Sequence, residues 1–114
     1  MNNKKIGTEF ERTMVALLAK CGYWVHFISP DARGAQPFDI IAVKEGYAVA
    51  MDCKTCADKY FRIGRLEENQ IMAFEKWLAC GNDTPYIAVE HNERIHLIPY
   101  TQLKKELKID LEQM

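Results

Sequence analysis

The sequence predicts an α/β protein with a mixed sheet, and the order of its periodic segments carries that prediction. Three short apolar runs follow one amphipathic segment, and a second amphipathic segment separates them from two further runs. The order is therefore αβββαββ, with one more helix expected at the end. A helix between two strands makes a crossover, so the strands before and after it are expected to be parallel neighbours.

The N-terminal part of the chain predicts a helix over residues 8–21. Its apolar stripe recurs at helical spacing and consists of Phe10, Met14, Leu17, Leu18 and Cys21. Gly22 follows, and glycine is a common helix stop. Residues 23–28 are aromatic and β-branched, which predicts a strand, and residues 29–37 contain two prolines and a glycine, which predicts a loop.

The remaining elements are assigned in the same way. Two strands joined by Lys44-Glu45-Gly46 are predicted at residues 40–43 and 47–51, and residues 55–65 are expected to be irregular. A helix over 67–79, strands at 86–89 and 95–98, and a helix over 100–107 complete the chain. The last residues are expected to fray.

Bulk composition predicts a single globular domain over residues 1–114, with 48% hydrophobic and 27% charged residues. No apolar run approaches the roughly 20 residues of a membrane span. The first residues show no signal peptide, so the expected compartment is the cytoplasm. The formal net charge of −1 argues mildly against a nucleic-acid partner, but a local distribution of charge can override that total.

Two acids and a lysine fall at the ends of the neighbouring strands. Asp39, in Pro37-Phe38-Asp39, opens the strand at 40–43, and Asp52-Cys53-Lys54 follows the strand at 47–51. Asp52 and Lys54 are two residues apart, so they share one face of the sheet, and a hairpin brings Asp39 beside them. This is the PD…(D/E)xK arrangement of metal-dependent nucleases, in which carboxylates hold a divalent cation and an ammonium group lies near the phosphate.

The acid-x-lysine triplet alone carries little weight. Chance gives about two acid-x-base triplets in a chain with 16 acidic and 15 basic residues. Glu106-Leu107-Lys108 is another match, which we interpret as a solvated helix face. Asp52 differs because it follows Ala48-Val49-Ala50-Met51, a run expected to be buried on both faces, and a buried carboxylate needs a partner.

The cysteines offer a second, weaker hypothesis. Cys53-Lys54-Thr55-Cys56 is formally a CxxC, but the histidines that would complete a zinc site, His91 and His96, lie too far along the chain for a zinc finger. Free thiols are therefore expected at all four cysteines.

The order and spacing of these motifs resemble the Holliday junction resolvases of the restriction-endonuclease-like superfamily, both archaeal-type and RecU-type. Gly7-Thr8-Glu9-Phe10-Glu11-Arg12, then Leu17-Leu18 and Gly22-Tyr23, look like their opening motif. The resemblance implies a restriction-endonuclease-like mixed sheet with an αβββαβ core flanked by helices. It also implies site roles: Asp39, Asp52 and Glu11 at the metal, Lys54 as catalytic lysine, and Gln70 as a support from the second helix. Two departures are the missing mid-chain stalk of the RecU type and the lack of a basic net charge.

Several of these residues also have a structural explanation. Thr8-x-x-Glu11 fits a capping box, so Glu11 could cap the first helix, with Glu9 as the fallback ligand. Lys54 could serve only to pair with Asp52, and Gln70 could be an ordinary polar helix residue.

One basic stretch has aromatic residues interleaved with its charges. Lys59, Arg62 and Arg65 are candidates for contact with DNA phosphates, and Arg33 in the preceding loop is another. The alternative is a solvated loop whose aromatic side chains belong to the core.

The predicted function is a Mg²⁺-dependent DNA endonuclease, with Mn²⁺ expected to substitute, acting on branched DNA such as a four-way junction. Alternatives are a nuclease for linear, flap or single-stranded DNA, of phage or restriction type, a non-catalytic DNA-binding module with the same fold, and a zinc-binding interaction module. Resolving a junction needs two cuts, which favours a homodimer, as the resemblance also implies. Trp77 and Tyr100 are the apolar candidates for its interface.

Overall fold

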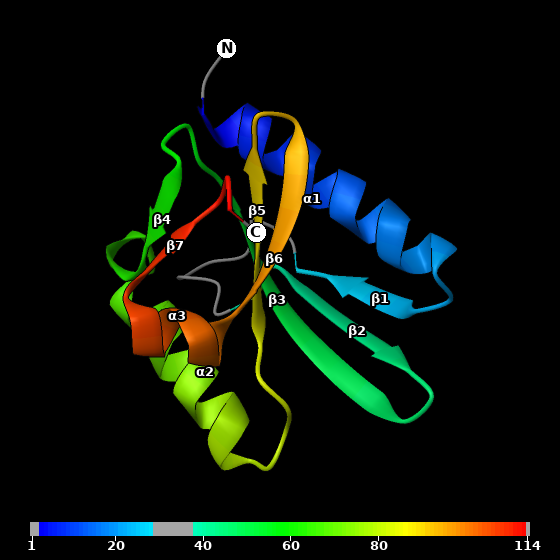
Figure 1. Ribbon diagram of the computed structural model, residues 1–114. Coiled ribbons are helices and arrows are strands. Elements are labelled where there is room, and N and C mark those ends of the chain that lie inside the picture. The colour runs from blue at the N-terminus through cyan, green and yellow to red at the C-terminus, as the bar shows by residue number, and fades with distance from the viewer. Residues whose placement is uncertain (1–2, 29–37, 114) are drawn as a thin grey trace.

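One mixed sheet of five strands forms the centre of the computed structural model, whose described residues are 3–28 and 38–113 (Figure 1). The strand order is β1-β2-β3-β5-β6. The pairs β1–β2, β2–β3 and β5–β6 are antiparallel, and β3–β5 is parallel. These strands are β1 Trp24–Phe27, β2 Ile40–Lys44, β3 Tyr47–Thr55, β5 Tyr86–His91 and β6 Arg94–Pro99.

The parallel step from β3 to β5 is the crossover that the sequence predicts. It contains α2 (Glu68–Ala79), preceded by the short strand β4 (Tyr60–Arg62) and the 3₁₀ turn η1 (Ile63–Arg65). The predicted mixed sheet and the αβββαβ order are therefore confirmed, with β4 and η1 as additions. No helix in the described residues is both long and apolar enough to cross a membrane.

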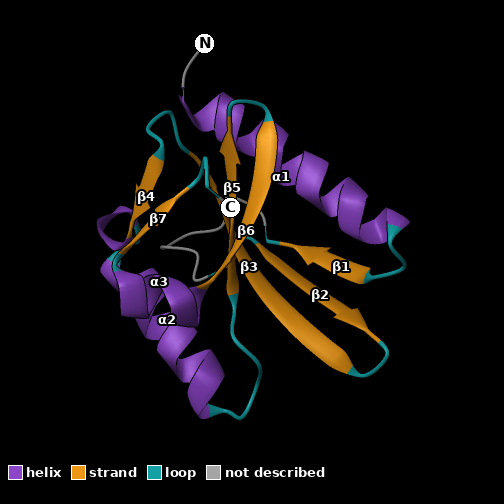
Figure 2. Cartoon of the chain, viewed as in Figure 1, coloured by secondary structure: helices purple, strands orange, loops and turns teal. Residues whose placement is uncertain are grey.

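Helices cover both faces of the sheet (Figure 2). On one face, α1 (Asn3–Lys20) packs Phe10 and Met14 against Ile40, Ala42 and Met51. Ile40 and Ala42 are two residues apart on β2 and share this face, because successive side chains of a strand point to opposite faces.

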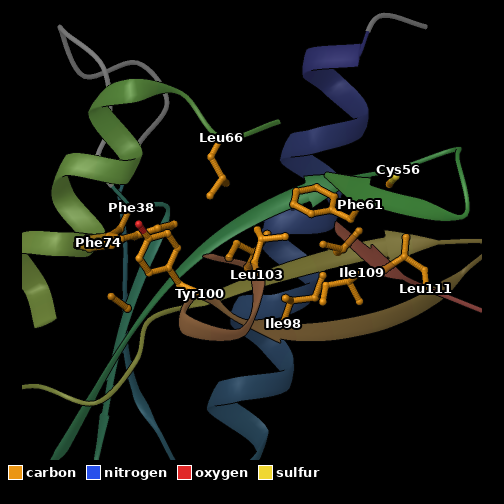
Figure 3. Packing of buried hydrophobic residues seen from close by; sticks show 13 residues of the cluster. Phe38, Cys56, Phe61, Leu66, Phe74, Ile98, Tyr100, Leu103, Ile109 and Leu111 are labelled. Atoms are coloured by element: carbon orange, nitrogen blue, oxygen red, sulfur yellow. The ribbon is translucent and has the colours of Figure 1, made fainter. Parts of the chain in front are cut away.

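The second face carries α2 and α3 (Tyr100–Glu106), whose buried side chains form the larger core cluster (Figure 3). Phe74 stacks on Phe38 with ring centres 5.4 Å apart, and its ring centre lies 4.9 Å from that of Tyr100. Because both faces are covered, three consecutive residues of β3, Ala50, Met51 and Asp52, are buried. Burial of β3 on both faces was predicted from its apolar run.

A separate two-stranded antiparallel ribbon forms from β4 and β7 (Lys108–Asp110). Phe61 and Ile109 are buried in the α2-side core, and Leu111 just beyond β7 is 2% exposed. The predictions of an irregular 55–65 segment and of frayed last residues are therefore wrong. Glu106, Leu107 and Lys108 are solvent-exposed as predicted, but the helix ends at Glu106 and Lys108 belongs to β7. Three-residue strands are too short to show an alternating pattern in the sequence.

Two expectations about helices also need correction. α1 begins at Asn3, five residues before the predicted start, and Leu17 and Cys21 of its predicted stripe are exposed. Tyr100 is 1% exposed, and its hydroxyl donates to Glu75 Oε2 at 2.6 Å. The prediction of Tyr100 as an interface residue is wrong, because the first residue of α3 faces the core.

Candidate active site

Asp52 is the most deeply buried charged group near the predicted motif. It lies on β3, the middle strand of the sheet, and is 1% exposed. Its Oδ1 accepts a hydrogen bond from Gln70 Nε2 at 3.1 Å. Its Oδ2 lies 3.4 Å from Lys54 Nζ, and the Lys54 side chain is 19% exposed. The buried carboxylate thus has a partner from α2 and an ammonium group that reaches solvent.

Asp39 lies directly before β2 and is tied to β3 by two hydrogen bonds. Its backbone N–H donates to Met51 O at 3.0 Å, and its Oδ2 accepts from Cys53 N–H at 2.8 Å. The register pairs Ile40 with Met51, so the start of β2 lies beside the C-terminal part of β3. The predicted placement of Asp39 next to Asp52-Cys53-Lys54 is therefore what the structure has.

Gln70 owes its orientation to the start of α2. Its Oε1 accepts from the Glu67 backbone N–H at 2.9 Å, and the Glu67 side chain accepts from the Gln70 backbone, which makes a capping box. This contact uses the amide oxygen and leaves Nε2 to donate to Asp52. Gln70 therefore caps a helix and holds a site carboxylate with the same amide group.

Glu11 approaches the same carboxylates from α1. Because the helix begins at Asn3, Thr8 lies inside it, so the capping box predicted for Thr8 and Glu11 is not formed. Burial and, secondly, the charge of Asp39 together raise the pKa of Glu11 to about 7, while Lys54 opposes the shift. Glu11 is thus within electrostatic reach of Asp39 and Lys54, whereas Glu9, the fallback, is exposed.

The charges at this site are poorly balanced. Burial and, secondly, the neighbouring Asp39 together raise the pKa of Asp52 to about 8, against the opposing effect of Lys54. Asp52 Oδ2 is buried and has no hydrogen-bond partner among the described residues. Three ionised carboxylates beside one ammonium group would carry an excess of negative charge, so Glu11 and Asp52 have raised pKa values, and an additional cation would favour their ionised forms.

These donors suit a hard divalent cation, which prefers oxygen ligands. In the described ranges, no three His, Cys, Asp or Glu side chains converge closely enough to hold a metal by themselves. The carboxylates of Asp39 and Asp52 can therefore supply only part of the coordination of a divalent cation, and water and substrate phosphates would supply the rest. The orphaned Oδ2 of Asp52 marks where such an ion would find an anionic ligand.

The predicted DNA-contact residues lie along and beside β4. Lys59 precedes β4, Arg62 ends it, and Arg65 ends η1; all three are exposed. Arg65 Nη2 donates to Thr55 O at 2.9 Å, which fixes η1 beside the end of β3. Arg33 lies outside the described residues.

Two contributors to the site have no signal of their own in the motif. The backbone N–H of Cys53 orients Asp39, and any residue type would supply that donor. The second is the capping partner Glu67, which the sequence did not indicate because glutamate is not among the usual N-cap residues.

Three comparisons place the chain among known proteins. The model of the archaeal Holliday junction resolvase (Hjc) family matches residues 2–113. The chain is 27% identical over 95 residues to the crossover junction endodeoxyribonuclease Hjc of Methanocaldococcus jannaschii, covering 82% of this chain and 66% of that protein. It therefore spans just under two thirds of that relative's length.

A solved structure is similar over nearly the whole fold. Archaeoglobus fulgidus Hjc, a Holliday junction resolvase from an archaeal hyperthermophile, matches with a TM-score of 0.69 at 18% identity, over 91% of this chain and 86% of that one. The likeness confirms the predicted fold class, a restriction-endonuclease-like mixed sheet flanked by helices.

Proposed function

Because the chain belongs to the archaeal Holliday junction resolvase family, we propose that it is a metal-dependent endonuclease that hydrolyses phosphodiester bonds in branched DNA. The observation that carries the proposal is the juxtaposition of Asp39, Asp52 and Lys54 at one place on the sheet, with the buried Asp52 carboxylate 3.4 Å from the lysine. A carboxylate pair and an ammonium group are the side chains that metal-assisted phosphodiester hydrolysis needs. The proposed catalytic unit is residues 1–114, acting in the cytoplasm.

The proposed roles follow from the contacts of each side chain. Asp39 and Asp52 hold the cation, Mg²⁺ or Mn²⁺, which when bound lowers the pKa of a water molecule and offsets phosphate charge. The Cys53 N–H and the Gln70 amide fix the two carboxylates by donating to Asp39 Oδ2 and Asp52 Oδ1. Such outer partners orient metal ligands.

Lys54 and Glu11 complete the proposed site. Lys54 stays near Asp52 and projects partly into solvent, where its ammonium group can donate to a phosphate oxygen as negative charge develops. Glu11 adds negative charge beside Asp39 and thereby favours cation binding. Its raised pKa supports this role, because a carboxylate that serves only as a helix cap would be stabilised in its charged form.

The proposed assembly is a homodimer, since two related cuts need two such sites. In place of Tyr100, the edge strand β6 offers apolar side chains: Leu97 is 48% exposed and Ile95 is 37% exposed. Leu97 also lines a hollow of about 250 Å³ between α1 and the sheet, whose other lining residues are Leu18, Tyr23, Val49, Met51 and Tyr86. We propose that a second copy covers this apolar surface. Trp77 is a weaker candidate, because its indole N–H already donates to Asp83 O at 3.0 Å.

The test is a cleavage assay on labelled four-way, flap, linear duplex and single-stranded DNA, each with Mg²⁺ and with chelator. Paired cuts in the four-way junction with Mg²⁺ only are expected. Asp52→Asn should lower the cleavage rate by orders of magnitude, because the cation loses an anionic ligand, while leaving DNA binding intact or tighter, because no negative charge is added near the phosphate. Equal cutting of all four substrates would refute the preference for branched DNA. If the wild type and Asp52→Asn both bind DNA and neither cuts it, the proposed nuclease activity would be refuted.

A further inference from the structure

The outer face of the β4–β7 ribbon is strongly cationic. Side chains alternate along both strands, so Phe61 and Ile109 point into the core. Tyr60, Arg62, Lys108 and Asp110 therefore lie on the opposite face, where Arg62 and Lys108 are exposed and Asp110 is the cross-strand partner of Tyr60. Lys108 belongs to β7, 46 positions after Arg62, and only the pairing of the two strands brings them together.

Three cations surround the ring of Tyr60. Lys59 Nζ lies 5.1 Å, Arg62 Cζ 5.5 Å and Lys108 Nζ 4.6 Å from the ring centre. The negative face of an aromatic ring attracts each of them. Because the three charged groups all lie within 5.5 Å of one ring centre, no two of them can be much farther apart than the Debye length, which is about 10 Å at 0.1 M salt. Salt therefore screens their mutual repulsion only partly.

This arrangement is unfavourable for the free protein. Arg62 and Lys108 are direct cross-strand partners, and like charges in that position destabilise a sheet. Lys59 pairs with Asp110 at 3.6 Å, but among the described residues no carboxylate lies within 4 Å of the charged groups of Arg62 and Lys108. The chain has a net charge of −1, so a gathering of cations is not a consequence of its composition.

We propose that this face is a second phosphate-binding surface, which takes the backbone of a DNA arm away from the bond that is cut. This inference rests on the proposed function and names Lys108 and Tyr60 as parts of the DNA interface. Tyr60 acts as a platform that gathers three flexible cations around one ring, and DNA phosphates supply the opposite charge that Arg62 and Lys108 lack.

The ribbon is also fixed with respect to the candidate active site. Arg65, in η1 directly after β4, donates to the carbonyl of Thr55, the residue after Lys54. Its guanidinium also lies 5.4 Å from the ring centre of Phe61, on the core side of β4. A DNA arm held by the ribbon would therefore keep a constant position relative to Lys54.

The experiment compares Lys108→Gln and Arg62→Gln with the wild type and with Lys20→Gln. Lys20 is exposed at the C-terminal end of α1, across the molecule from the ribbon, so it controls for net charge (Figure 1). Binding of a four-way junction and of a linear duplex is measured in chelator over a range of salt concentrations. Each ribbon variant should lower the slope of log affinity against log salt by about 0.9 and weaken binding about three- to tenfold for both DNAs.

Thermal melting separates a binding role from a structural one. Lys108→Gln removes a like-charged cross-strand pair, so its melting temperature should equal or exceed that of the wild type. The proposal would be overturned if the ribbon variants lower the melting temperature without changing DNA affinity. It would also be overturned if their loss of affinity is no larger than that of Lys20→Gln. Neither result would refute the proposed nuclease activity. A wild type that binds through the ribbon but never cuts DNA with Mg²⁺ would instead refute the proposed function and leave this surface standing.

Discussion

Asp52→Asn should stabilise the metal-free protein at pH 8, although it removes a buried group that makes two polar contacts. Burial and the charge of Asp39 raise the pKa of Asp52 from 3.8 to about 8. A carboxyl group whose pKa is raised by folding stabilises the folded state fully below its unfolded pKa. That contribution is lost as the pH rises through the folded pKa.

The magnitude follows from the width of that window. Between pH 5 and pH 8 the unfolded chain has released the proton of Asp52 and the folded chain largely keeps it. Each pH unit then lowers the free energy of unfolding by about 1.4 kcal/mol, or roughly 3–4 kcal/mol over the interval. For a domain of this size, that corresponds to about 10–15 °C in melting temperature. Asparagine does not titrate, so the variant lacks this loss.

The assay is calorimetry or urea unfolding of both proteins in chelator at pH 5, 6, 7 and 8. Glu11 and His91, whose pKa values are also raised, titrate in both proteins and largely cancel in the difference. Asp83→Asn is the matched control, because it makes the same change at an exposed carboxylate. Mg²⁺ should restore stability to the wild type alone, by about 2.7 kcal/mol at a hundredfold excess over its dissociation constant.

A constant difference between wild type and Asp52→Asn from pH 5 to pH 8 would refute this reasoning. It would mean that Asp52 is ionised throughout, and that Lys54 and Gln70 compensate its burial without a metal.

Four further predictions test other parts of the molecule. Glu11→Gln should slow single-turnover cleavage about 10- to 100-fold without lowering the melting temperature, and unchanged cleavage would remove Glu11 from the site. Gln70→Leu should raise the Mg²⁺ concentration needed for half-maximal cleavage about 10- to 100-fold, because Asp52 loses its amide donor; an unaltered Mg²⁺ titration would contradict that role. Leu97→Asp should yield a folded monomer by light scattering, since the side chain is already half exposed, and a persisting dimer would place the interface elsewhere. Ile109→Ala should lower the free energy of unfolding by about 2–4 kcal/mol, whereas a frayed C-terminus would make it neutral.

The predictions that succeeded rest on neighbours in sequence. Asp39 and Asp52 meet because a two-residue connection, Glu45-Gly46, closes the hairpin between β2 and β3, and Lys54 follows Asp52 at the strand period of two. The partnership of Gln70 with Asp52 spans the crossover, and only the resemblance suggested it. The N–H of Cys53 could not be predicted, because a backbone donor carries no residue signature.

The predictions that failed concern long-range pairing and an unusual backbone. β4 and β7 are three residues each, and nothing within either segment specifies its partner. Leu107 ends α3 with φ 70°, a left-handed conformation in which glycine is common and leucine is not. Because no glycine stands at position 107, the sequence did not indicate that the helix ends at Glu106. Lys108, the first residue of β7, was therefore assigned to a helix face.

The two places where local rules are broken carry charges of opposite sign. Asp52 is a carboxylate buried in a strand beside another acid, and Arg62 with Lys108 is a like-charged pair across a ribbon. Each arrangement destabilises the free protein, and each is relieved by a ligand that the proposed reaction supplies, a divalent cation for the acids and phosphates for the cations. Such conflicts between local preference and fold are expected at functional sites, where ligand binding compensates them. A chain of net charge −1 can therefore offer DNA a cationic surface, because three of its 15 Lys and Arg residues gather around Tyr60 on the ribbon.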